Sequence, residues 1–346
     1  MSNETAKTKR VTLTDIAKAL DVSKATVSKA LNNREDVSVE TRLRVREMAD
    51  ELHYRATVAN SDLPNIAVVS NALESMYTLQ VISGIADECL LHGLAMTLTT
   101  APGVAGAKLV PLSDSWLRLI AAKGYWGLIT ITTEVPRRLT RLVSDLGLAL
   151  VVIDPVRAAS PDVMTIGATN WNGALAATRF LLGLGHRRIA YIQGPEGSLP
   201  SEERYEGYLS ALRQAGVRQD PELIVGDDFT FDCGLAAGRT LLSRPAEQRP
   251  TAMFCGCDVS AMGVIEAVRE AGLRVPDDVS VVGFDDTFLA VSSAPRLTTV
   301  RQPMRDMGAA AVRTLVRTHT GAEPGAPIRL NTQLVVRDST APPRSL

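Results

Sequence analysis

The sequence predicts a small all-α head joined to a larger α/β core with two doubly wound parallel-sheet subdomains. Its 346 residues exceed one average domain, so about two or three units are expected. The first part of the chain fits three helices within about 45 residues. From Asn65 onward, short runs rich in Val, Ile and Leu alternate with helical stretches. Continuous apolar strands separated by helices are typical of parallel sheets buried on both faces.

The first two helices are predicted between residues 11 and 32, with a tight turn between them. Thr12 has Asp15 three positions later, which is a capping-box arrangement. Asp21 ends the first helix, and Ser23 is a favourable N-cap for the second. The apolar positions at helical spacing are Leu13, Ile16, Ala17, Leu20, Val27, Ala30 and Leu31. This pattern is typical of a helix-turn-helix, whose second helix enters a DNA major groove.

The outward face of the second helix is basic and polar. It carries Lys24, Ser28, Lys29 and Asn32 and no acid. The flanking segments add Lys7, Lys9, Arg10 and Arg34. Such a surface suits DNA phosphates and base edges. The alternative is two ordinary amphipathic helices of a bundle, which would not need this concentration of cations.

A third helix is predicted over 39–52, after an N-cap at Ser38. Its basic side carries Arg42, Arg44 and Arg46, for which a solvated helix face is an equally good explanation. Residues 1–60 hold 11 Lys and Arg against 9 Asp and Glu, whereas the remainder holds 26 against 29. A basic head on a mildly acidic body fits nucleic-acid contact confined to the N-terminal part.

The segment from Tyr54 to Leu63 is either a linker or a short helix that forms only on DNA. After it, the expected strands are Ile66–Ser70, Ala95–Thr99, Gly127–Ile131, Ala149–Ile153, Arg188–Gln193, Ala252–Cys255 and Val279–Phe284. The expected helices are Leu79–His92, Asp114–Lys123, Arg137–Leu146, Trp171–Leu184, Glu203–Gln214, Cys233–Leu242 and Ala261–Ala271. Ligands of open α/β sheets bind at the carboxyl ends of the strands, so the cleft between two such sheets is the expected ligand site.

The cysteine pattern and the lack of targeting signals indicate a cytoplasmic protein. The four cysteines are expected to be reduced thiols, because Cys255 and Cys257 are too close for an easy disulfide. No metal-ligand spacing is present, so neither a metal nor another cofactor is expected. The first residues lack the apolar core of a signal peptide, and no window reaches the roughly 18 apolar residues of a membrane span.

Several ordered runs carry a family resemblance along nearly the whole chain. They are TLTDIAKALDVSKATVSKALN, VSVETRLRVREMADELHYR, GHRRIAYIQGP, RYEGYLSALRQAGV, FTFDCGLAAGRTLL, GLRVPDDVSVVGFDD and PRLTTVRQP. With these runs in this order, the chain resembles the lactose-repressor (LacI/GalR) family of bacterial transcription regulators. The resemblance implies a helix-turn-helix domain at 10–55, a hinge at 56–64 and a periplasmic-binding-protein-like core at 65–340. Within the core it implies an N-subdomain at 65–166 and 302–320 and a C-subdomain at 167–301 and 326–337.

The resemblance also implies which residues of the head touch DNA. Base-reading positions fall on Lys24, Ala25 and Lys29, and phosphate-contact positions fall on Thr12, Ser23, Thr26, Ser28 and Asn32. Lysine can donate to guanine, whereas alanine offers only a methyl contact. Leu63 falls at the hinge leucine that wedges into the minor groove. A linker leucine that packs on the core is the alternative, and Ala56-Thr57 and Asp62 depart from the family's hinge pattern.

In the cleft, the resemblance places ligand contacts at Tyr77, Asp154, Arg204, Phe229, Cys257 and Asp285. A guanidinium and two carboxylates can bind sugar hydroxyls, and an aromatic ring can stack on a sugar face. For Arg204 the alternative is a surface ion pair with Glu202 or Glu206. Cys257 stands where the family commonly has a polar amide, so the ligand is not expected to be bound as in the best-known members.

These features together imply a sequence-specific DNA-binding repressor that acts as a homodimer on a pseudo-palindromic operator. A small-molecule effector, expected to be a sugar or sugar derivative, would control it from the cleft. The alternatives are a sugar-binding protein without regulation and a regulator without small-molecule control. An enzyme is not expected, because the sequence contains no G-x-S-x-G, H-E-x-x-H or P-loop motif. In the cell, the protein is expected in the bacterial cytoplasm, on the nucleoid when bound to DNA.

Overall fold

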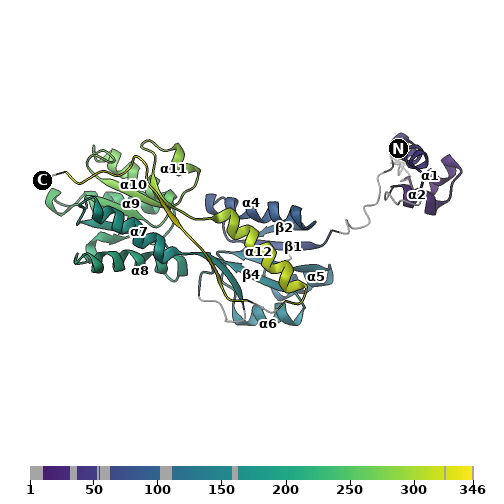
Figure 1. Cartoon of the computed structure of the whole chain (residues 1–346), viewed down its shortest axis with the longest axis horizontal. Helices are drawn as coiled ribbons and strands as arrows, with labels where there is room; N and C mark the ends of the chain where they lie inside the picture. Colours follow the sequence, from purple (N-terminus) through teal and green to yellow (C-terminus); the bar gives the residue numbers. More distant parts are fainter. Residues whose placement is uncertain are drawn as a thin grey trace, which may run out of the picture. The chain divides into compact units, whose positions relative to one another are not determined.

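The computed structural model describes residues 11–31, 37–52, 54, 63–101, 111–157, 163–322 and 325–344. The chain divides into two compact units, one that ends at Leu63 and one that begins at Pro64 (Figure 1). Within the described residues, no helix is both long enough and apolar enough to cross a lipid bilayer.

The head contains three helices, α1 (Leu13–Leu20), α2 (Lys24–Leu31) and α3 (Val39–Glu51). The Asp15 carboxylate accepts hydrogen bonds from the backbone amide (2.8 Å) and the hydroxyl (2.7 Å) of Thr12. Asp21 takes the left-handed conformation with φ of 53°, which an aspartate tolerates better than most residues. Ser23 Oγ accepts from the amide of Thr26 at 3.0 Å. These contacts confirm the predicted start of α1, the turn and the N-cap of α2.

Apolar side chains from all three helices form the core of the head. Its buried members are Ile16, Ala17, Val27, Ala30, Val37, Val45 and Ala49. Leu43 of α3 lies outside this core and is 54% exposed. Because Val27 and Ala30 face inward, the opposite side of α2 presents Lys24 and Lys29 to solvent.

The first sheet of the core is parallel, in the order β11-β5-β4-β3-β1-β2. Its strands are β1 (Asn65–Ser70), β2 (Ala95–Thr100), β3 (Tyr125–Ile131), β4 (Ala149–Ile153), β5 (Met164–Ala168) and β11 (Ile328–Leu330). Helices α4 (Met76–Leu91) and α12 (Met304–His319) cover one face, and α5 (Asp114–Ala122) and α6 (Arg137–Asp145) cover the other. Alternating residues of β1 enter the two apolar clusters, as expected for a strand buried on both faces. We call this layer set the N-lobe.

The second sheet has the order β12-β10-β9-β8-β6-β7, and only its edge pair β10–β12 is antiparallel among the described strands. Its strands are β6 (Ile189–Ile192), β7 (Ile224–Val225), β8 (Ala252–Cys255), β9 (Ser280–Asp285), β10 (Thr298–Arg301) and β12 (Gln333–Val335). Helices α7 (Asn170–Gly183) and α8 (Leu199–Gln214) cover one face, and α9 (Phe231–Leu242) and α10 (Asp258–Glu270) cover the other. A short helix, α11 (Phe288–Ser292), follows β9. We call this set the C-lobe; both lobes are visible in Figure 1.

The chain passes between the lobes three times, after β5, after β10 and after β11. The first and third passages are joined, since the Thr332 amide donates to Thr169 Oγ1 at 3.0 Å and the Thr169 amide donates to Leu330 O at 2.8 Å. The assignment of 326–337 to the C-subdomain is therefore wrong for its first part. β11 pairs with β5 of the N-lobe and only β12 joins the C-lobe, because the third passage adds an edge strand to each sheet.

All fourteen core strands and helices expected from the sequence are present, several with earlier helix starts. The pattern missed β5, β7, β10, β11, β12, α11 and α12. The missed strands are two to five residues long, and three of them lie at sheet edges. Such short strands form through pairing with distant segments rather than through local propensity.

Helices α4 and α12 touch backbone to backbone in the N-lobe. A Cβ atom on Gly84 would lie 2.0 Å from the carbonyl oxygen of Arg305, and one on Gly308 would lie 2.2 Å from that of Val81. Only glycine permits this approach at either position. The start of α4 and the passage that leads into α12 both border the site described next.

Candidate functional site

The surface of α2 presents most of the predicted DNA contacts. Ser23, Lys24, Ala25 and Lys29 are exposed, whereas Thr26 and Ser28 are half-buried. Thr12, before α1, is exposed and bonded to Asp15. Asn32 lies outside the described residues. Leu63 is 48% exposed at the end of its unit.

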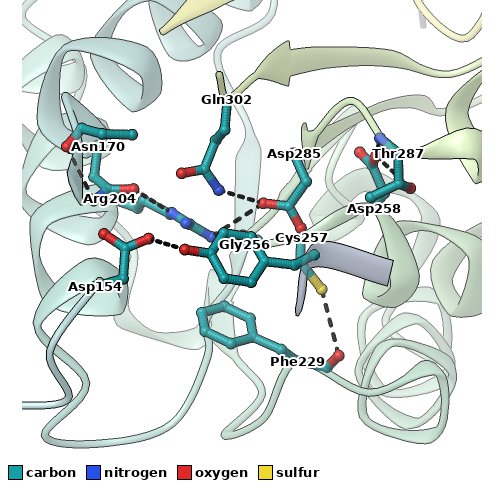
Figure 2. A network of polar contacts seen from close by, with 12 residues as sticks. Asp154, Asn170, Arg204, Phe229, Gly256, Cys257, Asp258, Asp285, Thr287 and Gln302 are labelled. Carbon is teal, nitrogen blue, oxygen red and sulfur yellow. Dashed lines mark hydrogen bonds and ion pairs between the residues drawn. The ribbon is translucent and has the colours of Figure 1, made fainter. Parts of the chain in front are cut away.

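The predicted effector residues of the core come together between the two lobes (Figure 2). Asp154 directly follows β4 of the N-lobe, and Asp285 ends β9 of the C-lobe. Arg204, on α8, lies close enough to influence both carboxylates. These three residues are each less than 7% exposed. Carboxylates at the ends of parallel strands and an arginine of α8 thus form a buried polar cluster where α/β folds bind ligands.

Arg204 is held by a set of C-lobe contacts. Its Nε donates to Asn170 Oδ1 at 2.9 Å, and a terminal nitrogen donates to the carbonyl oxygen of Gly256 at 2.5 Å. The same nitrogen lies 3.9 Å from Asp285 Oδ1. The guanidinium carbon also lies 3.9 Å from the ring centre of Phe284, a cation–π distance. The alternative of a surface ion pair with a neighbouring glutamate is therefore wrong.

Asp154 is bonded to Tyr77, which comes from the first turn of α4. The Tyr77 hydroxyl donates to Asp154 Oδ2 at 2.6 Å. Burial raises the pKa of Asp154, and the hydrogen bond from Tyr77 and the charge of Arg204 oppose this rise. Burial and the neighbouring Asp154 raise the pKa of Tyr77 well above its ordinary value, so the phenol keeps its proton.

Asp285 is bonded to Gln302, a residue that the sequence analysis did not identify. Gln302 Nε2 donates to Asp285 Oδ1 at 2.6 Å. Burial raises the pKa of Asp285 to about 6, and Arg204 and Gln302 oppose the rise. Gln302 is 3% exposed, and its side-chain carbonyl oxygen has no hydrogen-bond partner among the described residues. The signal that could have found it is its place inside the PRLTTVRQP run, at the second passage between the lobes.

Cys257 has a structural role at the start of α10. Its sulfur accepts a hydrogen bond from the Ser260 amide at 3.3 Å, which makes it the N-cap of α10. The thiol also contacts the carbonyl oxygen of Phe229 at 3.5 Å. Burial and then the charge of Asp285 raise the pKa of Cys257 to about 12, so the residue is a neutral thiol. The half-buried Phe229 ring lies beside it and 5.4 Å from the Arg204 guanidinium carbon.

The arrangement suits recognition of a hydroxyl-rich molecule. Asp154, Asp285 and Gln302 offer acceptor oxygens, Arg204 offers donors, and Phe229 offers an aromatic face. Within the described residues, no cluster of His, Cys, Asp and Glu could hold a metal ion.

Two family models match the chain. The model of bacterial regulatory proteins of the lacI family matches residues 12–56. The model of the periplasmic binding protein-like domain matches residues 178–340.

Curated relatives match over almost the whole chain. An HTH-type transcriptional repressor PurR of Pectobacterium carotovorum subsp. carotovorum (strain PC1) is 32% identical, over 95% of this chain and 97% of its own. An HTH-type transcriptional repressor CytR of Escherichia coli (strain K12) is 32% identical, over 95% and 96%.

Solved structures of regulators are similar to the whole chain. The lac repressor dimer bound to operator and the anti-inducer ONPF is 26% identical, with a TM-score of 0.79 over 96% of this chain and 100% of its own. A transcriptional regulator CelR–cellobiose complex is 31% identical, with a TM-score of 0.70 over 95% and 100%.

Proposed function

Because the chain belongs to the LacI family of bacterial regulatory proteins, we propose that it is a sequence-specific transcriptional repressor controlled by a small-molecule effector. The observation that carries the proposal is the pairing of two sites in one chain. A basic helix is exposed on the head, and a buried polar cluster joins the two lobes of the core. The domains of the chain would be the head at 10–55, the hinge at 56–64 and the core at 65–340.

The head would read DNA through α2. Its side chains at Lys24, Ala25 and Lys29 are exposed and would contact bases. The phosphate contacts would come from Thr12, Ser23, Thr26, Ser28 and Asn32. Leu63 would wedge into the minor groove, a role that suits a large apolar side chain 48% exposed.

The effector would bind among Tyr77, Asp154, Arg204, Phe229, Cys257 and Asp285. A sugar or sugar derivative fits best, since its hydroxyls can donate to the buried carboxylates and accept from the guanidinium. The similar CelR structure is a complex with cellobiose. Because Cys257 is occupied as a helix cap, it would shape the wall beside Phe229 rather than bind a hydroxyl strongly.

The protein would act as a homodimer on a pseudo-palindromic operator. Large apolar side chains are exposed on α4 and β2 (Leu79, Leu90, Leu91 and Leu98) and on α11 (Phe288 and Val291). Exposed apolar groups mark interaction surfaces where they form a contiguous patch, and we propose that these residues do so in the dimer. We expect Leu90→Lys with Phe288→Lys to yield monomers in analytical ultracentrifugation. Val336→Lys, at a residue 55% exposed elsewhere, is the control that should stay dimeric.

The relatives found are regulators, and the proposal assigns no catalytic step to this chain. It places the protein in the bacterial cytoplasm. The competing function is sugar binding without DNA control, or DNA control without a small molecule.

One combined experiment separates these functions. Selection of duplexes from a random pool by the full-length protein should return an inverted repeat. A thermal-shift screen of sugars and nucleosides, with and without that duplex, should then find a compound whose stabilising effect depends on DNA. A compound that stabilises the protein equally with and without the duplex would instead support small-molecule binding that is not coupled to DNA binding.

A further inference from the structure

A third buried aspartate lies beside the effector site and has no place in the proposed ligand contacts. Asp258 is the first residue of α10 and is 0% exposed. Figure 2 shows it next to Asp285 and Thr287. A carboxyl group this deep must be bonded to be tolerated, so its partners indicate what it does.

The turn that carries Asp285 is conformationally strained. Asp285 has φ of 118° and Asp286 has φ of 60°, both in the region that L-residues avoid. Such residues persist only where their surroundings hold them, and they cluster at ligand sites. Asp286 is held by Arg301 (2.7 Å) and Arg337 (2.6 Å).

The next residue of the turn is held by Asp258. Asp258 Oδ2 accepts from the amide of Thr287 at 2.7 Å and from its hydroxyl at 3.0 Å. Asp258 Oδ1 accepts from the Thr299 hydroxyl on β10 at 2.6 Å. The fit is tight, because a Cβ atom on Gly283 would lie 2.5 Å from Asp258 Oδ1. One carboxyl group therefore ties α10 to β10 and to the turn after β9.

We propose that Asp258 is a positioning residue of the effector site, which holds Asp285 toward the effector by anchoring the strained turn after β9. The proposal rests on the function proposed above for that site. It does not require Asp258 to touch the effector. The anchor acts through Thr287, two residues from Asp285, while the two arginines hold Asp286 between them.

The charge state of the anchor makes the proposal testable. Burial and then the charge of Asp285 raise the pKa of Asp258, and the hydrogen bonds from Thr299 and Thr287 oppose this rise. The ionisable groups that face it are Asp285 and the thiols of Cys255 and Cys257, while Arg204 faces Asp285. An asparagine side chain can take the place of this carboxyl group, because its oxygen accepts from Thr287 and its NH2 group donates to the Thr299 hydroxyl oxygen.

Hydrogen exchange of the full-length protein at pH 7 tests the anchor without any ligand. In Asp258→Leu, the Thr287 amide loses its acceptor, and its exchange should accelerate by about tenfold or more. In Asp258→Asn, the same amide should stay within about threefold of the wild type, because the acceptor remains. Asp278→Leu is the matched control. Asp278 accepts the Arg274 amide at 2.9 Å, near the other end of β9, so its loss should leave Thr287 unchanged.

A pH profile adds a readout that simple packing would not change. The folded pKa values of Asp258 and Asp285 lie above the ordinary 3.8, so the folded chain retains protons that the unfolded chain has released. The free energy of unfolding should therefore fall progressively as pH rises above 3.8, with a shallower slope once Asp285 has ionised and no further fall once Asp258 has ionised. Asp258→Asn should remove the contribution of Asp258, which extends to the higher pH, and keep the contribution of Asp285.

Three results would overturn the proposal. One is wild-type exchange at Thr287 in Asp258→Leu. Another is an Asp258→Asn protein that loses protection as the leucine variant does. The third is an Asp258→Asn protein whose free energy of unfolding has the same pH dependence as the wild type. If the leucine variant does not fold, the asparagine variant and its pH profile still decide. Operator binding by the same variants tests the proposed function separately, since the head unit does not contain this anchor.

Discussion

Helix α2 of the head and the polar cluster of the core hold the side chains that we propose as ligand contacts in opposite ways. On α2, Lys24 and Lys29 are exposed. Val27 and Ala30, on the opposite side of the helix, are fully buried in the core of the head and hold the helix in place. In the core, Arg204 and Asp285 are themselves buried and are held by their contacts with neighbouring polar groups. A DNA duplex can be bound only at an exposed surface, whereas a small ligand can be enclosed within the protein. The difference predicts that substitutions on the exposed face of α2 change DNA binding alone, whereas substitutions in the buried cluster of the core change stability as well.

The largest effect is expected at Arg204. Arg204→Met should lower the free energy of unfolding of the core by about 3–5 kcal/mol, because it leaves buried Asp285 without its nearby cation. Urea unfolding of the full-length protein measures this loss. Arg239→Met is the control, since Arg239 pairs with Glu270 at the exposed surface and its removal should leave the midpoint unchanged. An Arg204 variant as stable as the Arg239 variant would contradict the contrast between the exposed side chains of α2 and the buried cluster of the core.

A smaller loss of stability is expected at the N-lobe side of the cluster. Tyr77→Phe removes the hydroxyl that donates to Asp154 and should lower the free energy of unfolding by about 1–3 kcal/mol. The pKa of Asp154 should rise further, since the hydrogen bond from Tyr77 lowers it. The same urea titration, repeated at pH 5 and pH 7, checks both statements. An unchanged free energy of unfolding at both pH values would mean that water replaces the phenol hydroxyl without loss of stability.

The matching test in the head concerns Lys29. Lys29→Ala should weaken binding to the selected operator by about 1–3 kcal/mol and relax the base preference at one position of each half-site. Fluorescence anisotropy with the operator and its single-base variants measures both effects. The unfolding midpoint should not change, because the side chain is exposed. An equal loss on every duplex would make Lys29 a phosphate contact instead.

The smallest effect is expected at the turn of the helix pair. Asp21→Gly should stabilise the head by about 0.5–1 kcal/mol, because glycine adopts the left-handed conformation that Asp21 takes with φ of 53°. Thermal unfolding of the head, followed through its NMR signals in the full-length protein, would show the rise in its melting temperature. A destabilised head would mean that the Asp21 side chain contributes more than its backbone strain removes.

The head could be predicted almost to the residue because its signals are local. The Thr12–Asp15 contacts, the left-handed Asp21 and the Ser23 N-cap each involve residues at most three positions apart. The main strands and helices of the core were also predicted, from continuous apolar runs. The edge strands β11 and β12 were not, because they form only by pairing with β5 and β10, far away in sequence.

The core site was only partly predictable, and for the same reason. Arg204, Asp154 and Asp285 came from the family resemblance, and the structure brings them together between the lobes. Gln302 and Asp258 could not be found by local pattern, since their partners lie 17 to 41 residues away. The sequence showed a cysteine in place of an amide at Cys257, but its use as a helix cap depends on the fold around Phe229.

The most direct test is a competition titration. Full-length protein would be bound to the selected inverted-repeat duplex at moderate salt and displaced with the same bases in scrambled order. The account predicts that the inverted repeat binds at least about 10³-fold more tightly, as specific sites do. Equal displacement by both duplexes would contradict it, because the exposed face of α2 would then bind phosphates without reading bases.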